Sequence, residues 1–229
     1  MLTVIVPTCS NESLEKFLPS FYKYCDANLV VVFNGEERQP KIPYGHCIYH
    51  PKRIGYTIAV NEAWDWINQP RLLSDGDMVA VVNDDVEFAG RCFEPLVDAI
   101  RRGAALAAPS VQPIGRDGLW ARSGEPYRWV FAEGWLFVTT AGWIRRAGEI
   151  APMGMMVPQI YDAAFTPAYC EDCDFSIRLY EAGGKIFKVP VPAIHRRSQT
   201  FSKLGPLKDL WWSRSREYLI AKWRLDTIA

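Results

Sequence analysis

The sequence lacks an excess of charge of either sign, since 26 Lys and Arg residues balance 26 Asp and Glu residues. A uniform basic field that attracts nucleic acid or an anionic membrane is therefore not expected. The chain also lacks an apolar run of the roughly 18 residues that a membrane-spanning helix needs. No signal peptide is expected, because residues 2–6 already have the pattern of a strand. These absences predict a cytoplasmic protein without a nucleic-acid partner.

Cysteine is sparse and irregularly spaced, and it suggests no disulfide framework. The six positions are Cys9, Cys25, Cys47, Cys92, Cys170 and Cys173. Free thiols in a reducing compartment are expected. The last two have the C-x-x-C spacing of zinc and redox sites, but acidic residues lie between them and no second pair follows. A zinc or redox role is therefore not favoured.

What the sequence has is a hydrophobic fraction of 49%, which can fill the core of one large domain. Apolar β-branched runs predict strands, and helical periodicity predicts helices. The expected strands are 2–7, 29–33, 47–50, 78–82, 104–108, 129–131, 135–138 and 185–189. The expected helices are 14–21, with Pro19 kinking or dividing it, 55–68, 93–102, 140–148, 171–182 and 206–225. This order predicts an α/β fold, with a mainly parallel mixed sheet and one antiparallel edge strand between layers of helices.

The end of the chain differs in composition from the part before it. Residues 1–200 are expected to form the main domain, and 201–229 a basic, aromatic extension that carries the last helix. We expect that helix to pack on the domain with its basic side near the entrance to the site. The packing side chains would be Leu210, Trp211 and Leu219. Peripheral contact of 206–225 with a membrane surface, or contact with a second subunit, is the alternative.

Residues 78–88 hold the strongest candidate for a site. The apolar run 78–82 predicts a buried central strand, and Asn83, Asp84 and Asp85 follow at its carboxyl end. Ligands of open α/β sheets bind at that edge. Adjacent carboxylates repel each other unless a cation or a proton lies between them, and a hard divalent cation shared with a phosphate meets that need. An ordinary Asn-Asp turn is the structural alternative.

Two other polar clusters follow predicted strands, and a third opens a helix, whose amino terminus attracts phosphate. The residues concerned are Pro7, Thr8, Asn34, Glu36, Arg53 and Gly55. Asn61 lies one turn further into that helix. We expect it to be structural, bracing the loop of residues 83–85.

Three carboxylates open the helix that begins at residue 171. Acidic residues are common there because the helix dipole stabilises negative charge. The functional alternative is that Glu171 or Asp172 acts as a general base beside a lidded pocket. Asp174 is spaced to pair with Arg178 one turn later.

His195 follows an apolar run that reads as a strand. An imidazole at that position can complete the metal shell that Asp85 begins, although a lone histidine is usually structural. The lid is expected within 150–169 or after His195, where the chain has no regular pattern.

Six motifs occur in one order along the chain. They are Thr-Val-Ile-Val-Pro-Thr, Val-Val-Val-Phe-Asn-Gly, Arg-Ile-Gly-Tyr-Thr-Ile-Ala-Val-Asn, Val-Val-Asn-Asp-Asp-Val, Glu-Gly-Trp-Leu-Phe-Val and Glu-Asp-Cys-Asp-Phe-Ser-Ile-Arg-Leu, followed by His195. This order resembles the family 2 glycosyltransferases of GT-A fold, and most of all their rhamnosyltransferase-like branch. The resemblance covers nearly all of residues 1–200.

The resemblance implies an enzyme that transfers a sugar, with inversion, from a nucleotide-diphosphate sugar to a glycan, a lipid-linked acceptor or a protein-linked acceptor. It implies Mn²⁺ or Mg²⁺ held by Asp85 and His195, and Asp172 as the base, with Glu171 contacting the acceptor. The implied donor-binding residues are Pro7, Thr8, Asn34, Glu36, Arg53, Gly55, Asn61, Asn83, Asp84, Gly134 and Trp135, the last two at the sugar. Asn83 stands in for the first Asp of the family's DxD motif, and Asn34 for its usual acid.

Three other functions remain open. A nucleotidyltransferase normally has a glycine-rich loop with Lys or Arg after its first strand, whereas residues 7–10 contain no glycine. A non-catalytic module that binds a sugar or nucleotide would not need the set of Asp85, Asp172 and His195. A retaining transferase on the same fold differs in the anomeric configuration of its product.

Overall fold

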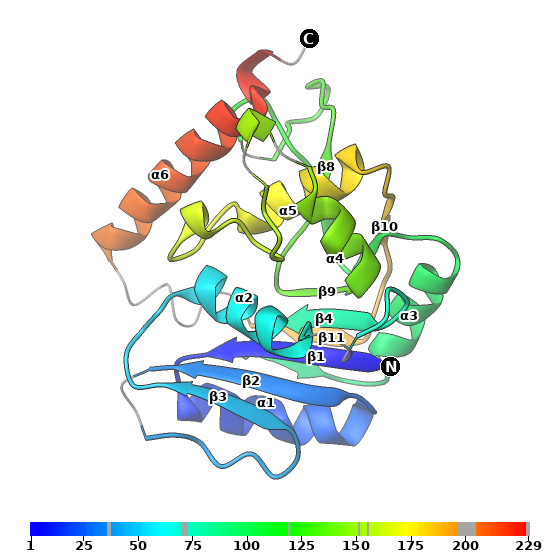
Figure 1. Cartoon of the computed structure of the whole chain (residues 1–229), viewed down its shortest axis with the longest axis vertical. Helices are drawn as coiled ribbons and strands as arrows, with labels where there is room; N and C mark the ends of the chain where they lie inside the picture. Colours follow the sequence, from blue (N-terminus) through cyan, green and yellow to red (C-terminus); the bar gives the residue numbers. More distant parts are fainter. Residues whose placement is uncertain are drawn as a thin grey trace.

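The computed structural model describes residues 1–35, 38–69, 73–118, 120–150, 152–154, 156–196 and 205–227. Its centre is a sheet of seven strands in the order β10-β6-β9-β4-β1-β2-β3 (Figure 1). The strands are β1 (Leu2–Thr8), β2 (Asn28–Asn34), β3 (His46–His50), β4 (Met78–Val82), β6 (Leu106–Ala108), β9 (Leu136–Thr140) and β10 (Ile186–Lys188). The predicted α/β class, with a mostly parallel sheet between helices, is confirmed.

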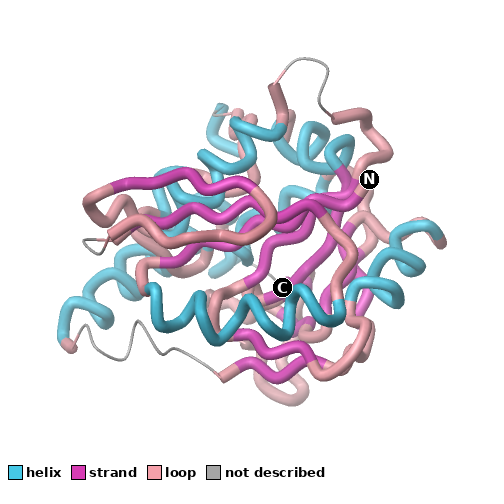
Figure 2. Tube along the Cα trace, turned by 90° about the horizontal axis from the view of Figure 1, so that it is seen from below, coloured by secondary structure: helices cyan, strands magenta, loops and turns pink. Residues whose placement is uncertain are grey.

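Helices cover both faces of the sheet, as Figure 2 shows from below. They are α1 (Asn11–Tyr24), α2 (Tyr56–Ile67), α3 (Phe93–Arg101), α4 (Ala141–Gly148) and α5 (Glu171–Glu181). The last helix, α6 (Pro206–Trp223), lies away from the sheet, where its Leu219 packs with Phe165 and with Ile177 of α5 (Figure 1). Successive strand residues point to opposite faces. Val4 and Val6 of β1 accordingly pack with α1 and α3, whereas Ile5 packs with α2, α4 and α5.

The antiparallel strand of the sheet is β9, and it lies inside the sheet between β4 and β6. The prediction of an antiparallel edge is therefore wrong. Residues 136–139 are all buried, which a strand with neighbours on both sides and helices on both faces requires. Because β9 runs against β4, its first residue lies at the carboxyl edge of the parallel strands.

Two small antiparallel sheets were not predicted, although the expected strand 129–131 overlaps one of their strands, because strands of three residues carry little information about their partners. β5 (Val86–Phe88) pairs with β11 (Ala193–His195), and β7 (Val111–Pro113) pairs with β8 (Val130–Ala132). The first pair places His195 opposite Val86, the residue after Asp85. Two segments about a hundred residues apart in the chain are thereby joined at the carboxyl edge.

Pro19 does not divide α1, which runs from Asn11 to Tyr24 and is capped by the Ser10 side chain. A proline in a helix leaves the carbonyl four residues earlier without its donor. That residue is Glu15, and both Glu15 and Pro19 are exposed, so water can reach the carbonyl. The predicted division of the first helix is wrong for this reason.

A buried ion cluster holds α6 against α5. The Lys222 ammonium lies 2.7 Å from a carboxylate oxygen of Asp162 and 2.7 Å from one of Asp174. The predicted pair of Asp174 and Arg178 is confirmed at 2.9 Å, with both side chains fully buried. Arg178 also donates to the Ile160 carbonyl at 2.5 Å. Two cations and two carboxylates thus join α5, α6 and the segment before η2 (Ala163–Phe165).

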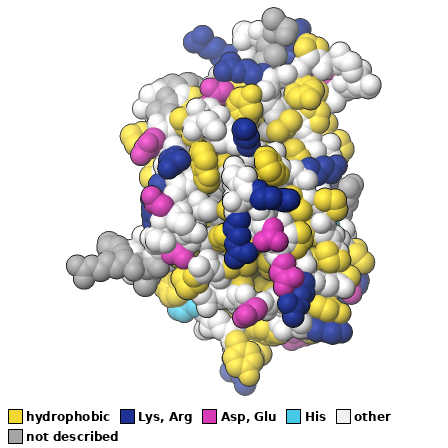
Figure 3. Space-filling model, turned by 90° about the vertical axis from the view of Figure 1, so that its right-hand side faces the viewer, with side chains coloured by type: hydrophobic (Ala, Val, Ile, Leu, Met, Phe, Trp, Pro, Cys, Tyr) yellow, Lys and Arg dark blue, Asp and Glu magenta, His cyan; other side chains and the backbone are white. Residues whose placement is uncertain are grey.

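The contacts of α6 differ in part from those predicted. Leu219 is fully buried as expected, but Leu210 is 63% exposed, because it lies on the opposite side of the helix from Leu219 and Lys222. The basic residues are also less available than their number suggests, since Lys222 is buried and Arg216 pairs with Asp117. Figure 3 shows another face of the molecule, where acidic and basic side chains are interspersed. Among the described helices, none has the length and apolar character needed to cross a bilayer.

We expect Lys222→Met to lower the free energy of unfolding by about 3–5 kcal/mol, the usual cost of removing one partner from a buried ion pair. Asp162 and Asp174 would keep their burial and lose a cation. Urea unfolding followed by tryptophan fluorescence measures the change. Arg214→Met is the matched control, since Arg214 is exposed on the same helix, and it should change stability by less than about 0.5 kcal/mol. Equal losses in the two variants would contradict the role given to the cluster.

Candidate active site at the carboxyl edge of the sheet

Four chain segments meet where β1, β2 and β4 end and β9 begins. Thr8 Oγ1 donates to Asp84 Oδ2 at 2.5 Å, and the Asn34 side-chain amide donates to the Thr8 carbonyl at 3.1 Å. The Asn83 amide donates to the carbonyl of Trp135 at 2.9 Å. Thr8, Asn34, Asn83 and Trp135 are thus brought together as the sequence predicted. Thr8, Asn34 and Asn83 meet because the parallel strands before them end at one edge of the sheet, whereas Trp135 lies there because it precedes the antiparallel strand β9.

The Asp84 carboxyl lies in a partly buried position next to Asp85. Burial raises the pKa of the Asp84 carboxyl to about 6 despite the hydrogen bond from Thr8, and the negative charge of Asp85 adds to the rise. Pro7 is buried within β1 and pairs in register with Val32 of β2, so it shapes the floor of the site.

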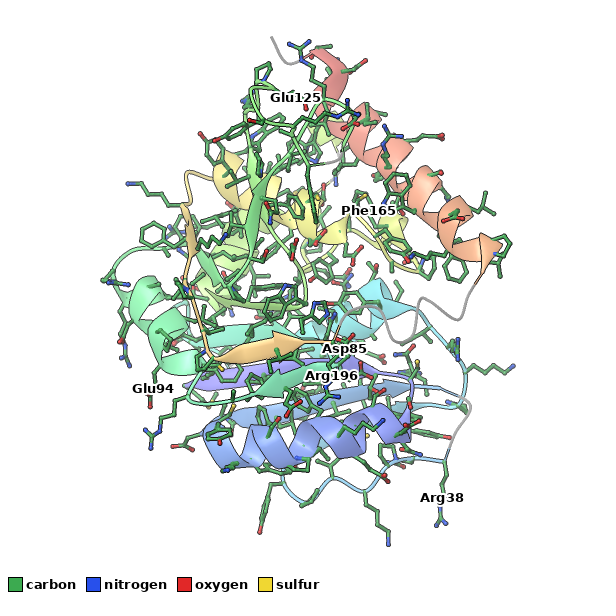
Figure 4. All side chains as sticks on the ribbon, turned by 180° about the vertical axis from the view of Figure 1, so that it is seen from behind. Arg38, Asp85, Glu94, Glu125, Phe165 and Arg196 are labelled. Atoms are coloured by element: carbon green, nitrogen blue, oxygen red, sulfur yellow. The ribbon has the colours of Figure 1, made fainter. Side chains whose placement is uncertain are left out.

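Asp85 and His195 form the centre of the site. Their Oδ1 and Nε2 atoms lie 3.1 Å apart, and the side chains are 10% and 17% exposed. The Arg196 amide donates to the Asp85 carbonyl at 3.0 Å, which fixes the end of β11 beside the turn, and Figure 4 shows Asp85 and Arg196 at this place. Among the described residues, neither Asp85 Oδ1 nor His195 Nε2 makes a hydrogen bond of acceptable geometry, and the same holds for Asn83 Oδ1.

These unpartnered atoms fit a divalent cation. A carboxylate oxygen and an imidazole nitrogen are suitable ligands for Mn²⁺, and Mg²⁺ takes few protein ligands when phosphates and water supply the rest. In the part of the chain that the structure describes, no group of three or more His, Cys, Asp and Glu side chains could hold a metal. The two residues would therefore depend on a ligand, such as a diphosphate, to complete the shell.

Asp172 and Glu171 lie in the first turn of α5. Asp172 Oδ2 accepts the Gly134 amide at 3.0 Å, and Oδ1 accepts the Cys173 amide at 2.8 Å. Burial raises the pKa of Asp172, although these two hydrogen bonds oppose the rise. Gly134 adjoins Trp135, so the candidate base is linked directly to the segment beside the Asp85 turn.

Glu171 is 7% exposed, and its Oε2 has no hydrogen-bond partner among the described residues. Burial raises the pKa of Glu171 well above its usual range, and the negative charge of Asp172 raises it further. Tyr169 and Cys170, which precede it, have φ angles of +82° and +62°. Residues other than glycine rarely have a backbone in this left-handed region, and such backbone strain is concentrated at functional sites.

Tyr56 is a site residue that the sequence-based prediction did not single out. Its hydroxyl donates to the Gly134 carbonyl at 3.0 Å. Burial raises the pKa of Tyr56 well above its usual value, and the charges of Glu171, Asp172 and Asp85 add to the rise. The Tyr56 hydroxyl is therefore affected electrostatically both by the carboxylates of α5 and by Asp85. The sequence feature that could have identified Tyr56 is its place within the motif of residues 53–61, which is one of the six motifs of the resemblance.

The amino terminus of α2 does not offer a phosphate site of the predicted kind. The Tyr56 and Thr57 amides both donate to the Pro167 carbonyl, at 2.8 and 3.4 Å. Gly55 has a φ of +89°, and a Cβ there would lie 2.9 Å from Pro167 Cα, so this glycine serves the close packing of the two segments. Arg53 is exposed beside this junction.

Asn61 is structural, but its predicted partner is wrong. Its side chain donates to the Tyr161 carbonyl at 2.7 Å and accepts the Tyr161 amide at 2.9 Å, so it braces that segment and does not reach the loop of residues 83–85. This amide pair and the Arg178 contact hold 159–161 in place, which favours a fixed wall over the predicted lid. Glu36, and residues 197–204 of the alternative lid after His195, lie outside the described residues.

Neither a protein-family profile nor a curated protein matches the sequence. Solved structures do match in shape. A 4-diphosphocytidyl-2C-methyl-D-erythritol synthase has a TM-score of 0.51 at 14% identity, over 90% of this chain and 97% of that one. The 2-C-methyl-D-erythritol 4-phosphate cytidylyltransferase of Thermus thermophilus has a TM-score of 0.49 at 14% identity, over 93% and 98%. That of Francisella tularensis has 0.49 at 11% identity, over 90% and 99%.

At such identity the first of these likenesses shows the fold and no more. That fold is a Rossmann-like, mainly parallel α/β sheet, and the resemblance to family 2 glycosyltransferases stays a prediction.

The burial of Glu171 predicts a dependence of stability on pH. Its raised pKa means that its contribution to stability is fully present below the unfolded-state pKa and is lost as the pH rises through the folded-state value. Glutamine keeps the shape and carries no charge. We therefore expect the free energy of unfolding of Glu171→Gln to rise relative to that of the unaltered protein as the pH is raised from 4 to 9. Urea unfolding at both pH values measures this, and a difference that does not change with pH would contradict the burial of a charge at this position.

Proposed function

We propose that this protein is a metal-dependent, inverting glycosyltransferase. It would transfer a sugar from a nucleotide-diphosphate donor to a hydroxyl group of a glycan, a lipid-linked acceptor or a protein-linked acceptor. The observation that carries the proposal is that Asp85 Oδ1 and His195 Nε2 face each other at 3.1 Å with no hydrogen-bond partner among the described residues, and are linked through residues 134–135 to the buried carboxylate of Asp172. The order of motifs in the sequence supports the same function.

Each residue has a defined task in this proposal. Asp85 and His195 would hold Mn²⁺ or Mg²⁺, which when bound offsets the charge of the leaving diphosphate. Asp84, fixed by Thr8, would receive the ribose. Asn34 and Arg53 would border the nucleotide.

Asp172 would accept the proton of the acceptor hydroxyl while that oxygen attacks the anomeric carbon from the face opposite the diphosphate. Each of its carboxylate oxygens accepts one amide and keeps a lone pair for this proton. Its pKa is raised by burial, which strengthens it as a base and moves the acid limb of the pH–rate profile upwards. Glu171 Oε2, which lacks a partner among the described residues, would orient the acceptor.

Nucleotidyl transfer is the second candidate function. It is favoured by the structural similarity of this chain to the 4-diphosphocytidyl-2C-methyl-D-erythritol synthase. In that reaction a phosphate attacks a nucleoside triphosphate, and a phosphate needs no general base. The turn after β1 has no glycine and no Lys or Arg to hold a triphosphate. Its polar side chains are already engaged, Thr8 with Asp84 and Ser10 as the cap of α1.

The products separate the candidates. Incubation with nucleotide sugars, acceptor glycans and Mn²⁺ should release a nucleoside diphosphate. Incubation with nucleoside triphosphates and sugar phosphates should release no pyrophosphate. Pyrophosphate release alone would replace the proposed function by the second candidate, and absence of turnover with demonstrable donor binding would favour a non-catalytic binding module.

Asp85→Ala is expected to abolish Mn²⁺-dependent binding of nucleoside diphosphates without unfolding the protein. His195→Ala should weaken it less, because water can replace one neutral ligand. Thermal shift with and without Mn²⁺ measures both, since a ligand that binds the folded state raises the melting temperature. Undiminished Mn²⁺-dependent stabilisation of Asp85→Ala would remove Asp85 from the metal site.

Asp172→Asn is expected to lower kcat by roughly 10²–10⁴-fold, the usual loss for a general base. Donor and metal binding should persist, since the substitution keeps the shape of the side chain and alters neither Asp85 nor His195. Steady-state kinetics with a working acceptor measures kcat, and Asp98→Asn, at an exposed position on α3, is the matched control. Near-normal transfer by Asp172→Asn would move the role to Glu171.

A further inference from the structure

We propose that Trp135 positions His195 for metal binding, an inference that rests on the proposed function. The sequence resemblance places Trp135 at the sugar of the donor. In the structure its indole instead stacks on the His195 imidazole, with ring centroids 4.9 Å apart and planes inclined by 10°.

His195 has few other constraints on its ring. It closes β11, which has three residues and pairs only with the three residues of β5 among the described strands. The position of the His195 backbone is fixed, because the backbone amide of the next residue, Arg196, donates to the Asp85 carbonyl. The rotation of the ring about its side-chain bonds is left to neighbouring side chains, and Trp135 covers one of its faces.

Trp135 is itself held on two sides. Its indole N–H donates to Glu133 Oε2 at 3.1 Å, and its carbonyl accepts the Asn83 amide at 2.9 Å. The following residue, Leu136, is in register with Val82 at the end of β4. Trp135 is therefore attached to the same turn that carries Asp85. The two candidate metal ligands, Asp85 and His195, are accordingly both positioned by the end of β4 and the start of β9.

The stack of Trp135 on His195 is better suited to orienting His195 as a metal ligand than to binding a sugar on the stacked indole face. A metal binds imidazole through a nitrogen lone pair in the plane of the ring, and neighbours that fix the ring orientation strongly affect metal affinity. A flat stack leaves that edge free, and Nε2 points to Asp85 Oδ1 at 3.1 Å. The indole face that covers His195 is not available to a sugar.

A second stack provides a matched control. Trp66 lies on His46 with centroids 4.0 Å apart and an angle of 9°. His46 begins β3, so this pair lies at the amino edge of the sheet, away from the candidate site. Trp66→Leu removes the same kind of contact without touching a proposed ligand.

The test is Mn²⁺ binding with a nucleoside diphosphate, which carries no sugar, present at one fixed concentration for every variant. It is measured at one pH from the electron paramagnetic resonance signal of free Mn²⁺. Trp135→Leu should raise the dissociation constant roughly 10–100-fold, the range for residues that orient metal ligands. Trp135→Phe keeps an aromatic face and should recover most of the affinity. Trp66→Leu should match the unaltered protein.

A double variant shows whether Trp135 acts through His195. Trp135→Leu combined with His195→Ala should bind Mn²⁺ no more weakly than His195→Ala alone. Unchanged Mn²⁺ affinity in Trp135→Leu, with weaker binding of nucleotide sugar, would overturn the inference in favour of a sugar platform and leave the proposed function standing. Failure of the unaltered protein to bind Mn²⁺ with or without nucleoside diphosphate would overturn both.

Discussion

The Lys222 ammonium between Asp162 and Asp174 is the contact on which the site half of the molecule depends. It joins the last helix to the helix that carries Glu171 and Asp172, and to the segment that borders the site. Buried charges that lose a partner are strongly destabilising, whereas a balanced and hydrogen-bonded set is tolerated. Asp174 is two residues from Asp172, so the cluster fixes the first turn of α5 and with it the candidate base.

The other half of the site comes from the sheet. Parallel strands deliver Thr8, Asn34 and the Asn83–Asp85 turn to one edge, and the reversed strand β9 starts at that same edge with Gly134 and Trp135 just before it. The β5–β11 pair adds His195. The Gly134 amide then joins the halves, because it donates to Asp172 while its chain neighbour Trp135 contacts both Asn83 and His195.

Local pattern predicted what depends on neighbours in the chain. The strand 78–82 and the Asp174–Arg178 pair were predicted correctly, since each is encoded within about five residues. What depends on distant partners was missed or misassigned. Nothing local shows that β9 runs inside the sheet, that Pro167 covers the start of α2, or that Lys222 is buried, because a helical lysine ordinarily reads as a solvated charge. The proximity of His195 to Asp85 was suggested by its place after an apolar run and by the resemblance, whereas the β5–β11 pairing that produces it was not predicted.

The most direct test of the account is a crystal structure with Mn²⁺ and the nucleoside diphosphate that stabilises the protein most, with anomalous data collected at the manganese edge. The account predicts one manganese peak about 2.0–2.3 Å from both an Asp85 carboxylate oxygen and His195 Nε2, with diphosphate oxygens completing the shell. A nucleotide bound at the carboxyl edge without manganese at these two atoms, or manganese bound elsewhere on the protein, would contradict it.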